Sequence, residues 1–94
     1  MELKSSINKI ETDIKNVIDS GYNHTMLLQL FQDLNTEIPN WILFSKNQNL
    51  KLEDVILAIL NDIVEAQRND DRVLLEDALE NGLLALLEEI KGLL

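Results

Sequence analysis

Apolar residues recur along this chain at spacings of three and four, and this spacing constrains the fold more than any other feature. The first segment shows it most clearly, because intervals of four, three, four and three separate Leu3, Ile7, Ile10, Ile14 and Val17. These are the a and d positions of a heptad, the pattern of an amphipathic helix with a narrow apolar stripe. One proline and three glycines interrupt the 94 residues. The chain is therefore expected to fold into helices.

Four segments carry this periodicity. They predict helices at residues 3–20, 25–45, 52–68 and 72–91, within a single domain that covers residues 1–94. The connections are short, so consecutive helices should be antiparallel. Pro39 lies inside the second segment, but the apolar phase of Leu34, Ile38 and Trp41 continues across it, which favours one helix kinked at Pro39. The predicted fold is an all-α, up-and-down antiparallel bundle of about four helices.

Residues typical of helix ends bound these segments. Gly21 follows the first helix, where a left-handed residue is common, and Asn23 or Thr25 can cap the second. The polar residues 46–49 are read as a loop, with Asn49 as the cap of the third helix. Asp70 or Asp71 is expected to cap the fourth helix.

The fourth segment is apolar around more than half of its circumference. If each helix buries one face, a monomer cannot cover all of its leucines, among them Leu83, Leu84, Leu87, Leu93 and Leu94. Exposed apolar patches usually mark interfaces, and twofold dimers are the commonest oligomers. We therefore expect a homodimer. Gly82, within this segment, is expected to permit close approach of another helix or to mark a bend.

Composition excludes several classes of function. A net charge of −9 argues against nucleic-acid binding, and no apolar run approaches the roughly 20 residues of a membrane-spanning helix. There is no cysteine for disulfides or thiolate chemistry. The start of the chain, residues 1–4, has no apolar signal region, which predicts a cytoplasmic location. Residues 53–94 carry a net charge of −8, which suits a basic partner or simple solubility.

Motifs of catalysis are missing from the sequence. His24 is the only histidine and is expected to be a surface or capping residue. No hydroxyl has a base placed by a recognisable motif, no glycine-rich phosphate loop occurs, and no Glu-x-x-His pair supports a di-iron site. The Asp70–Asp71 turn lacks calcium-loop spacing. We expect no catalytic residue, cofactor or metal.

A non-catalytic interaction module is therefore the preferred function. Such a small acidic adaptor or chaperone-like protein would bind an amphipathic helix of a partner through apolar anchors. The alternatives are a structural, self-assembling protein or an antitoxin-like neutraliser of a basic partner; a metal-binding or enzymatic bundle is less favoured. Aromatic residues near Pro39 and leucines of the last segment are the candidate interface: Trp41, Phe44, Leu83, Leu87 and Leu94.

Residues 49–90 also resemble the tail of small helical proteins of Firmicutes, some of which are linked to motility genes. The shared pattern is an acidic-polar turn, a Val-Leu-Leu run, an acidic residue, a Leu-Glu pair and late leucines. Here it is made by Asp70-Asp71, Val73-Leu74-Leu75, Asp77, Leu79-Glu80 and Leu86-Leu87-Glu88. Arg72 and Asn81-Gly82 depart from the pattern, which has aromatic residues there. The resemblance implies no catalytic residue.

Overall fold

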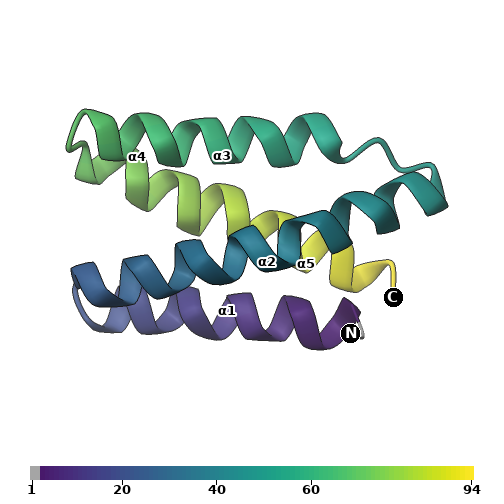
Figure 1. Cartoon of the computed structure of the whole chain (residues 1–94), viewed down its shortest axis with the longest axis horizontal. Helices are drawn as coiled ribbons and strands as arrows, with labels where there is room; N and C mark the ends of the chain where they lie inside the picture. Colours follow the sequence, from purple (N-terminus) through teal and green to yellow (C-terminus); the bar gives the residue numbers. More distant parts are fainter. Residues whose placement is uncertain (1–2) are drawn as a thin grey trace.

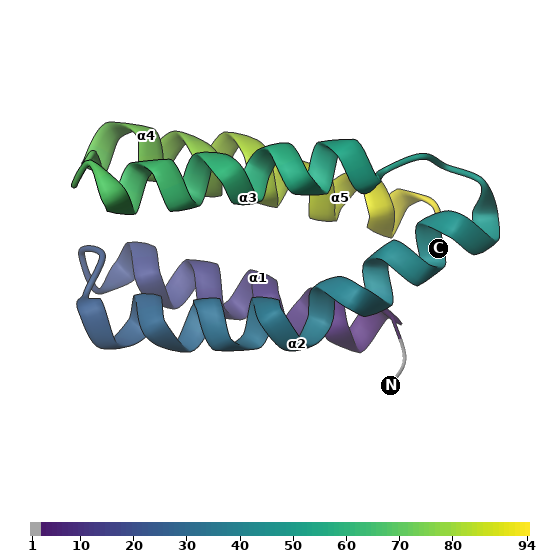
Figure 2. The same ribbon diagram turned by 45° about the horizontal axis from the view of Figure 1, so that its top comes forward.

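The computed structural model describes residues 3–94 and shows two helical hairpins packed on each other (Figure 1). The first hairpin pairs α1 (Leu3–Asp19) with α2 (His24–Gln48). The second pairs α3 (Glu53–Arg68) with a rod made of α4 (Arg72–Asp77), η1 (Ala78–Leu83) and α5 (Leu84–Gly92). Figure 2 shows the hairpins as two layers with their tight turns at the same end. The predicted all-α antiparallel bundle is confirmed.

The first hairpin follows the apolar spacing closely. Ile7, Ile10, Ile14 and Val17 of α1 have no exposed surface, because the narrow heptad stripe lies entirely against the other helices. Pro39 lies inside α2, which remains one helix, and the helix bends along its length (Figure 2). The sequence prediction of a single bent helix is therefore confirmed.

The turns use the residues that the sequence suggested, with one exception. Gly21 has φ 70°, the left-handed conformation that costs glycine little. Asn23 Oδ1 accepts hydrogen bonds from the amides of Thr25 and Met26, and Asp71 Oδ1 accepts one from Leu74 at 3.0 Å. The exception is Asn49, discussed next.

The loop predicted at residues 46–49 is wrong. α2 continues to Gln48, and Asn49 ends it in the left-handed conformation, with φ 56°. Asn49 therefore closes α2 and does not cap α3. The buried Ser45 hydroxyl accepts a hydrogen bond from the Leu52 amide at 2.8 Å, and this hydrogen bond fixes the turn into α3.

The last rod changes its packing partner along its length. α4 and η1 pack on α3, whereas α5 packs on α1. The one turn of π-helix, η1, is wider than a regular turn, so it shifts the phase between the apolar faces of α4 and α5. Gly82 lies in this turn close to α3, and a β-carbon added there would sit 3.5 Å from Ile59 Cγ1.

The expectation of uncovered leucines is wrong for Leu83 and Leu87 and holds for Leu93 and Leu94. The buried residues of the rod, which include Leu75, Leu79, Leu83, Leu87 and Ile90, are covered within one chain because the rod packs on α3 at one end and on α1 at the other. Among the leucines of the last segment that were expected to be uncovered, Leu93 and Leu94 are the two that are mostly exposed. Within residues 3–94, no helix combines the length and apolarity needed to cross a membrane. Met1 and Glu2, part of the segment behind the cytoplasmic prediction, lie outside the described residues.

Candidate functional site

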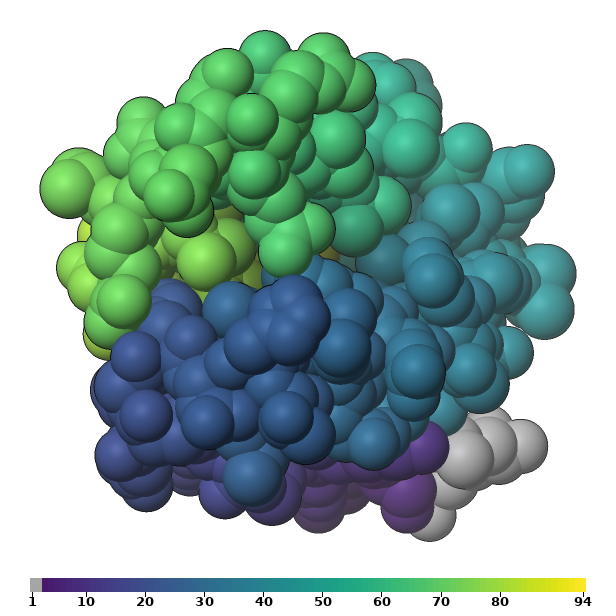
Figure 3. Space-filling model, turned by 60° about the vertical axis from the view of Figure 1, so that its left-hand side comes forward, coloured from purple at the N-terminus to yellow at the C-terminus, as the bar shows by residue number. Residues whose placement is uncertain are grey.

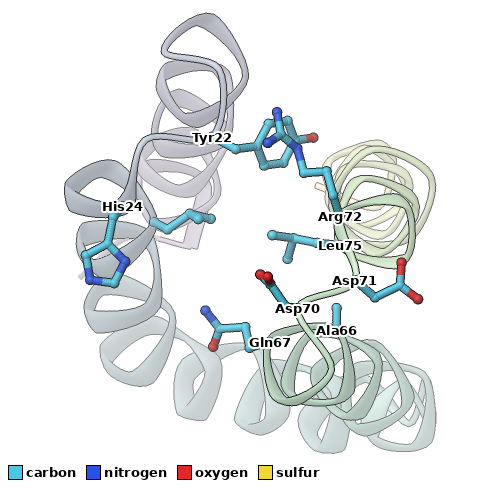
Figure 4. A pocket seen from close by; sticks show the side chains of 9 residues that line it. Tyr22, His24, Ala66, Gln67, Asp70, Asp71, Arg72 and Leu75 are labelled. Atoms are coloured by element: carbon cyan, nitrogen blue, oxygen red, sulfur yellow. The ribbon is translucent and has the colours of Figure 1, made fainter.

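A cavity of about 400 Å³ opens where the two tight turns meet. Figure 3 shows it as a hollow between the two hairpins, and Figure 4 shows side chains from both of them around it. We call it the end cavity. It is lined by Tyr22, His24, Leu27, Ala66, Gln67, Asp70, Asp71, Arg72 and Leu75.

One wall of the end cavity is an Arg72–Tyr22 stack that joins the hairpins. The Arg72 guanidinium carbon lies 4.1 Å from the centre of the Tyr22 ring, a cation–π geometry. Arg72 also donates to the Gly21 carbonyl at 3.2 Å and to Glu76 at 3.0 Å. Burial, together with the nearby charges of Glu80 and Glu76, raises the pKa of Tyr22 to about 12. The Tyr22 phenol is therefore neutral at physiological pH and lines the cavity as an uncharged group.

The polar groups of the cavity do not form a catalytic arrangement. His24 is an exposed first residue of α2, as the sequence suggested. Asp71 is engaged as the helix cap, and Arg72 is held by the contacts just described. Across the described chain, no three His, Asp or Glu side chains approach closely enough to hold a metal ion. The cavity is lined by both polar and apolar side chains.

The end cavity lies at one end of the seam between α2 and α3. α1 packs closely on α2 and α5, and α3 packs closely on α4 and η1, whereas α2 and α3 approach each other much less closely. Gln67 of α3 and His24 of α2 both line the cavity and so lie on the facing sides of these two helices.

Apolar residues continue from the end cavity along both helices. Val64, Leu60 and Leu57 lie about one, two and three turns before Gln67 on α3. The corresponding heptad positions after His24 on α2 include Leu28, Phe31 and Ile42. Leu57 and Val64 are each 52% exposed, and Leu28 is 46% exposed. We call this surface the α2–α3 groove: Leu28, Phe31 and Ile42 of α2 with Leu57, Leu60 and Val64 of α3.

A buried polar cluster lies on the opposite side of α2. The Trp41 indole donates to Ser6 Oγ at 2.9 Å, and the Ser6 hydroxyl donates to Glu37 Oε2. All three side chains are almost fully buried. Glu37 Oε1 has no hydrogen-bond partner within residues 3–94. The cluster fixes the register of α1 on α2.

A second polar contact joins the same two helices nearer the turn. Asp33 accepts from Gln29 at 3.1 Å and pairs with Lys9 at 3.5 Å. Burial, as the larger cause, and a hydrogen bond with Asp33, as the second, raise the pKa of Asp13 to about 7. The same hydrogen bond lowers the pKa of Asp33. Asp13 Oδ2 is buried and accepts no hydrogen bond within residues 3–94. Protonation of Asp13 would let this carboxyl donate to the Asp33 carboxylate.

The candidate interface residues from the sequence are scattered through the structure. Trp41, Leu83 and Leu87 are at most 2% exposed, so the folded monomer does not present them to a partner. Their helical phase, together with the turn η1, directs them inward. Phe44 is half-buried and lines a cavity of about 200 Å³ with Leu3, Asn40, Leu43 and Asn47. Leu94 is exposed at the chain end.

Sequence reasoning missed the carboxyl groups between α1 and α2, although a signal was present. Asp33 and Glu37 fall on the spacing that joins Leu30 to Trp41, and Asp13 falls between Ile10 and Val17 in the same way. Polar residues at apolar positions of a helix are the signature of buried polar contacts. The groove has no comparable signal, because it depends on which two helices fail to pack closely.

Comparison of the chain with protein-family models, with curated proteins and with solved structures finds no match. The groove and the polar contacts described above are therefore the basis for assigning a function.

Proposed function

We propose that the protein is a non-catalytic interaction module whose α2–α3 groove accepts an amphipathic helix of a partner protein. The observation that carries the proposal is the apolar stripe of Leu57, Leu60 and Val64, which no other helix of this chain covers fully. Its spacing of three and four residues is the spacing with which a docked helix interdigitates.

The opposite wall of the groove supports the same function. Leu28 and Phe31 of α2 stand one turn apart, and Leu28 is left largely exposed. A helix laid between the two walls would contact apolar side chains on both and would extend toward the end cavity. It would complete the packing that α2 and α3 do not provide for each other.

Burial of this surface has a favourable free energy of the right size for a regulated complex. An exposed leucine or valine side chain contributes about 1 kcal/mol or more when it moves from half-exposed to buried. Six such residues and a similar number on the partner helix give on the order of 10 kcal/mol, which the costs of association reduce to a weak, reversible complex with a Kd between roughly millimolar and micromolar. Formation of a homodimer and a cytoplasmic location remain predictions from the sequence.

The test is a titration of the full chain, labelled with ¹⁵N, with a helical peptide that has leucines on one face and glutamine on both flanks. We expect amide shifts concentrated at Leu28, Leu57 and Val64. Leu57→Asp should weaken binding at least about tenfold, since it places a charge in the apolar contact. Val55→Asp is the matched control, because Val55 is similarly exposed, at 45%, on another face of α3. Shifts spread evenly over the surface, or equal effects of the two variants, would rule the groove out.

A further inference from the structure

We infer, on the basis of the proposed function, that the partner helix carries cationic side chains along one flank only, the flank that lies over α3. The apolar residues of the groove determine that a helix can dock. The side chains that border the groove determine which helix docks best, and the two borders differ in charge.

The α3 border is acidic. Glu53 lies one turn before Leu57 on the groove stripe, and Asp54 and Glu65 follow the solvent side of that stripe. Arg68 is the one cation on this border, and it pairs with Glu65 at 3.8 Å in an exposed contact. Asp70 continues the negative charge into the wall of the end cavity. A docked helix would meet net negative charge along its whole α3 side.

The α2 border is not acidic. Its solvent-side positions Thr25, Gln32 and Pro39 are uncharged, and Lys46, one turn after Ile42, adds an exposed positive charge, so this border carries no exposed acidic side chain. The only charged residues between Thr25 and Ser45 are Asp33 and Glu37, and both are buried toward α1. Basic residues on this flank of a partner helix would therefore find no counter-charge within reach.

A second copy of this chain is a poor occupant by the same reasoning. Each copy carries a net charge of −9, and a copy docked through its own α3 would bring a second acidic border against the first. Like charges placed together at an interface oppose association. The charge pattern therefore favours a different protein with a basic flank.

Four peptides with one identical leucine face test this inference on the full chain. One carries lysine on one flank, one carries lysine on both flanks, one carries glutamate, and one carries glutamine as above. At low ionic strength we expect the single-flank lysine peptide to bind about tenfold tighter than the glutamine peptide. Lysine on the second flank should add less than about twofold, and added salt should remove the advantage.

Variants of the protein locate the effect. Glu65→Lys should abolish the preference for lysine, whereas Glu89→Lys makes the same change of net charge at an exposed position of α5, away from α3, and should leave most of it. Equal affinities for all four peptides would overturn the charge inference and leave helix binding intact. Binding of none would overturn the proposed function itself. A dimer in sedimentation equilibrium that Leu57→Asp dissociates would assign the groove to a second copy and overturn the inference.

Discussion

Replacing Asp13 with asparagine should remove a pH dependence from the stability of the bundle. The Asp13 carboxyl keeps its proton in the folded state up to about pH 7, against an ordinary pKa of 3.8. In the unfolded chain the same carboxyl is already ionised through that interval. The folded state therefore binds one more proton, and the free energy of unfolding falls as the pH rises from about 4 to about 7.

The structure sets the size of the effect. Each pH unit across the interval is worth about 1.4 kcal/mol, which gives a ceiling of about 4 kcal/mol. Asp13 is only partly buried, so solvent screening reduces the expected loss to about 2 kcal/mol. The lowered pKa of Asp33 affects stability in the opposite direction. It stabilises the folded state at pH values above the ordinary pKa of 3.8, and this stabilisation is lost only as the pH falls below that value, outside the interval in which Asp13 titrates.

Asparagine at this position mimics the protonated acid, because its amide can donate to Asp33 at every pH. We expect Asp13→Asn to match the wild type near about pH 4 and to exceed its stability by about 2 kcal/mol near about pH 8. Urea denaturation at a series of pH values measures this, with the fluorescence of Trp41, the single tryptophan, as the signal. Asp62→Asn, at an exposed position of α3, is the control. Parallel curves of unfolding free energy against pH for the wild type and Asp13→Asn would show that Asp13 does not hold a proton in the folded state near neutral pH.

Three further predictions concern stability. Ser6→Ala should lower the free energy of unfolding by about 2–3 kcal/mol, because it leaves the buried Glu37 carboxyl and the indole without their common partner; a loss below about 0.5 kcal/mol in urea denaturation would contradict this. Gly21→Ala should lower the free energy of unfolding by about 1 kcal/mol, because residue 21 has a positive φ. In Gly82→Ala the added β-carbon meets only ordinary contacts, so this variant should be neutral or stabilised by up to about 1 kcal/mol. Thermal denaturation in which Gly82→Ala is the less stable variant would refute this. Arg72→Ala should lower the free energy of unfolding by no more than about 1 kcal/mol but should speed hydrogen exchange at the amide of Tyr22, because the Arg72–Tyr22 stack is lost. Unchanged exchange would argue that the stack does not hold the two hairpins together.

The helices could be predicted because their apolar periodicity is long and regular. α1 and α3 begin and end within a residue or so of the predicted boundaries, and Gly21, Asn23 and Asp71 occupy the predicted turn roles. The extension of α2 to Gln48 was missed because its last turn is polar and exposed. Nothing in a pattern of apolar residues marks the end of a helix that projects beyond the core.

The site was less predictable for a reason of packing. The expectation of exposed leucines assumed that the fourth segment buries one face against one neighbour, whereas the rod packs on α3 through α4 and η1 and on α1 through α5, which covers Leu75, Leu83 and Leu87. Neither this change of neighbour nor the π-turn has a distinct sequence signature beyond Gly82. Once those leucines are buried, the available apolar surface lies on α2 and α3 instead.

The π-turn also determines where this chain tolerates a change of length. It holds one residue more than a regular helical turn, so a one-residue deletion within Ala78–Leu83 would restore a regular helix. That deletion would leave α4 and α5 in nearly the same rotational phase, because the wider turn already takes up the extra residue, so Leu75 and Ile90 would still both point into the core. Related sequences with one residue fewer between these two positions should therefore keep the fold with a regular helical turn in place of η1, whereas the connection between Gln48 and Glu53 is held by the Ser45–Leu52 hydrogen bond and should keep its length.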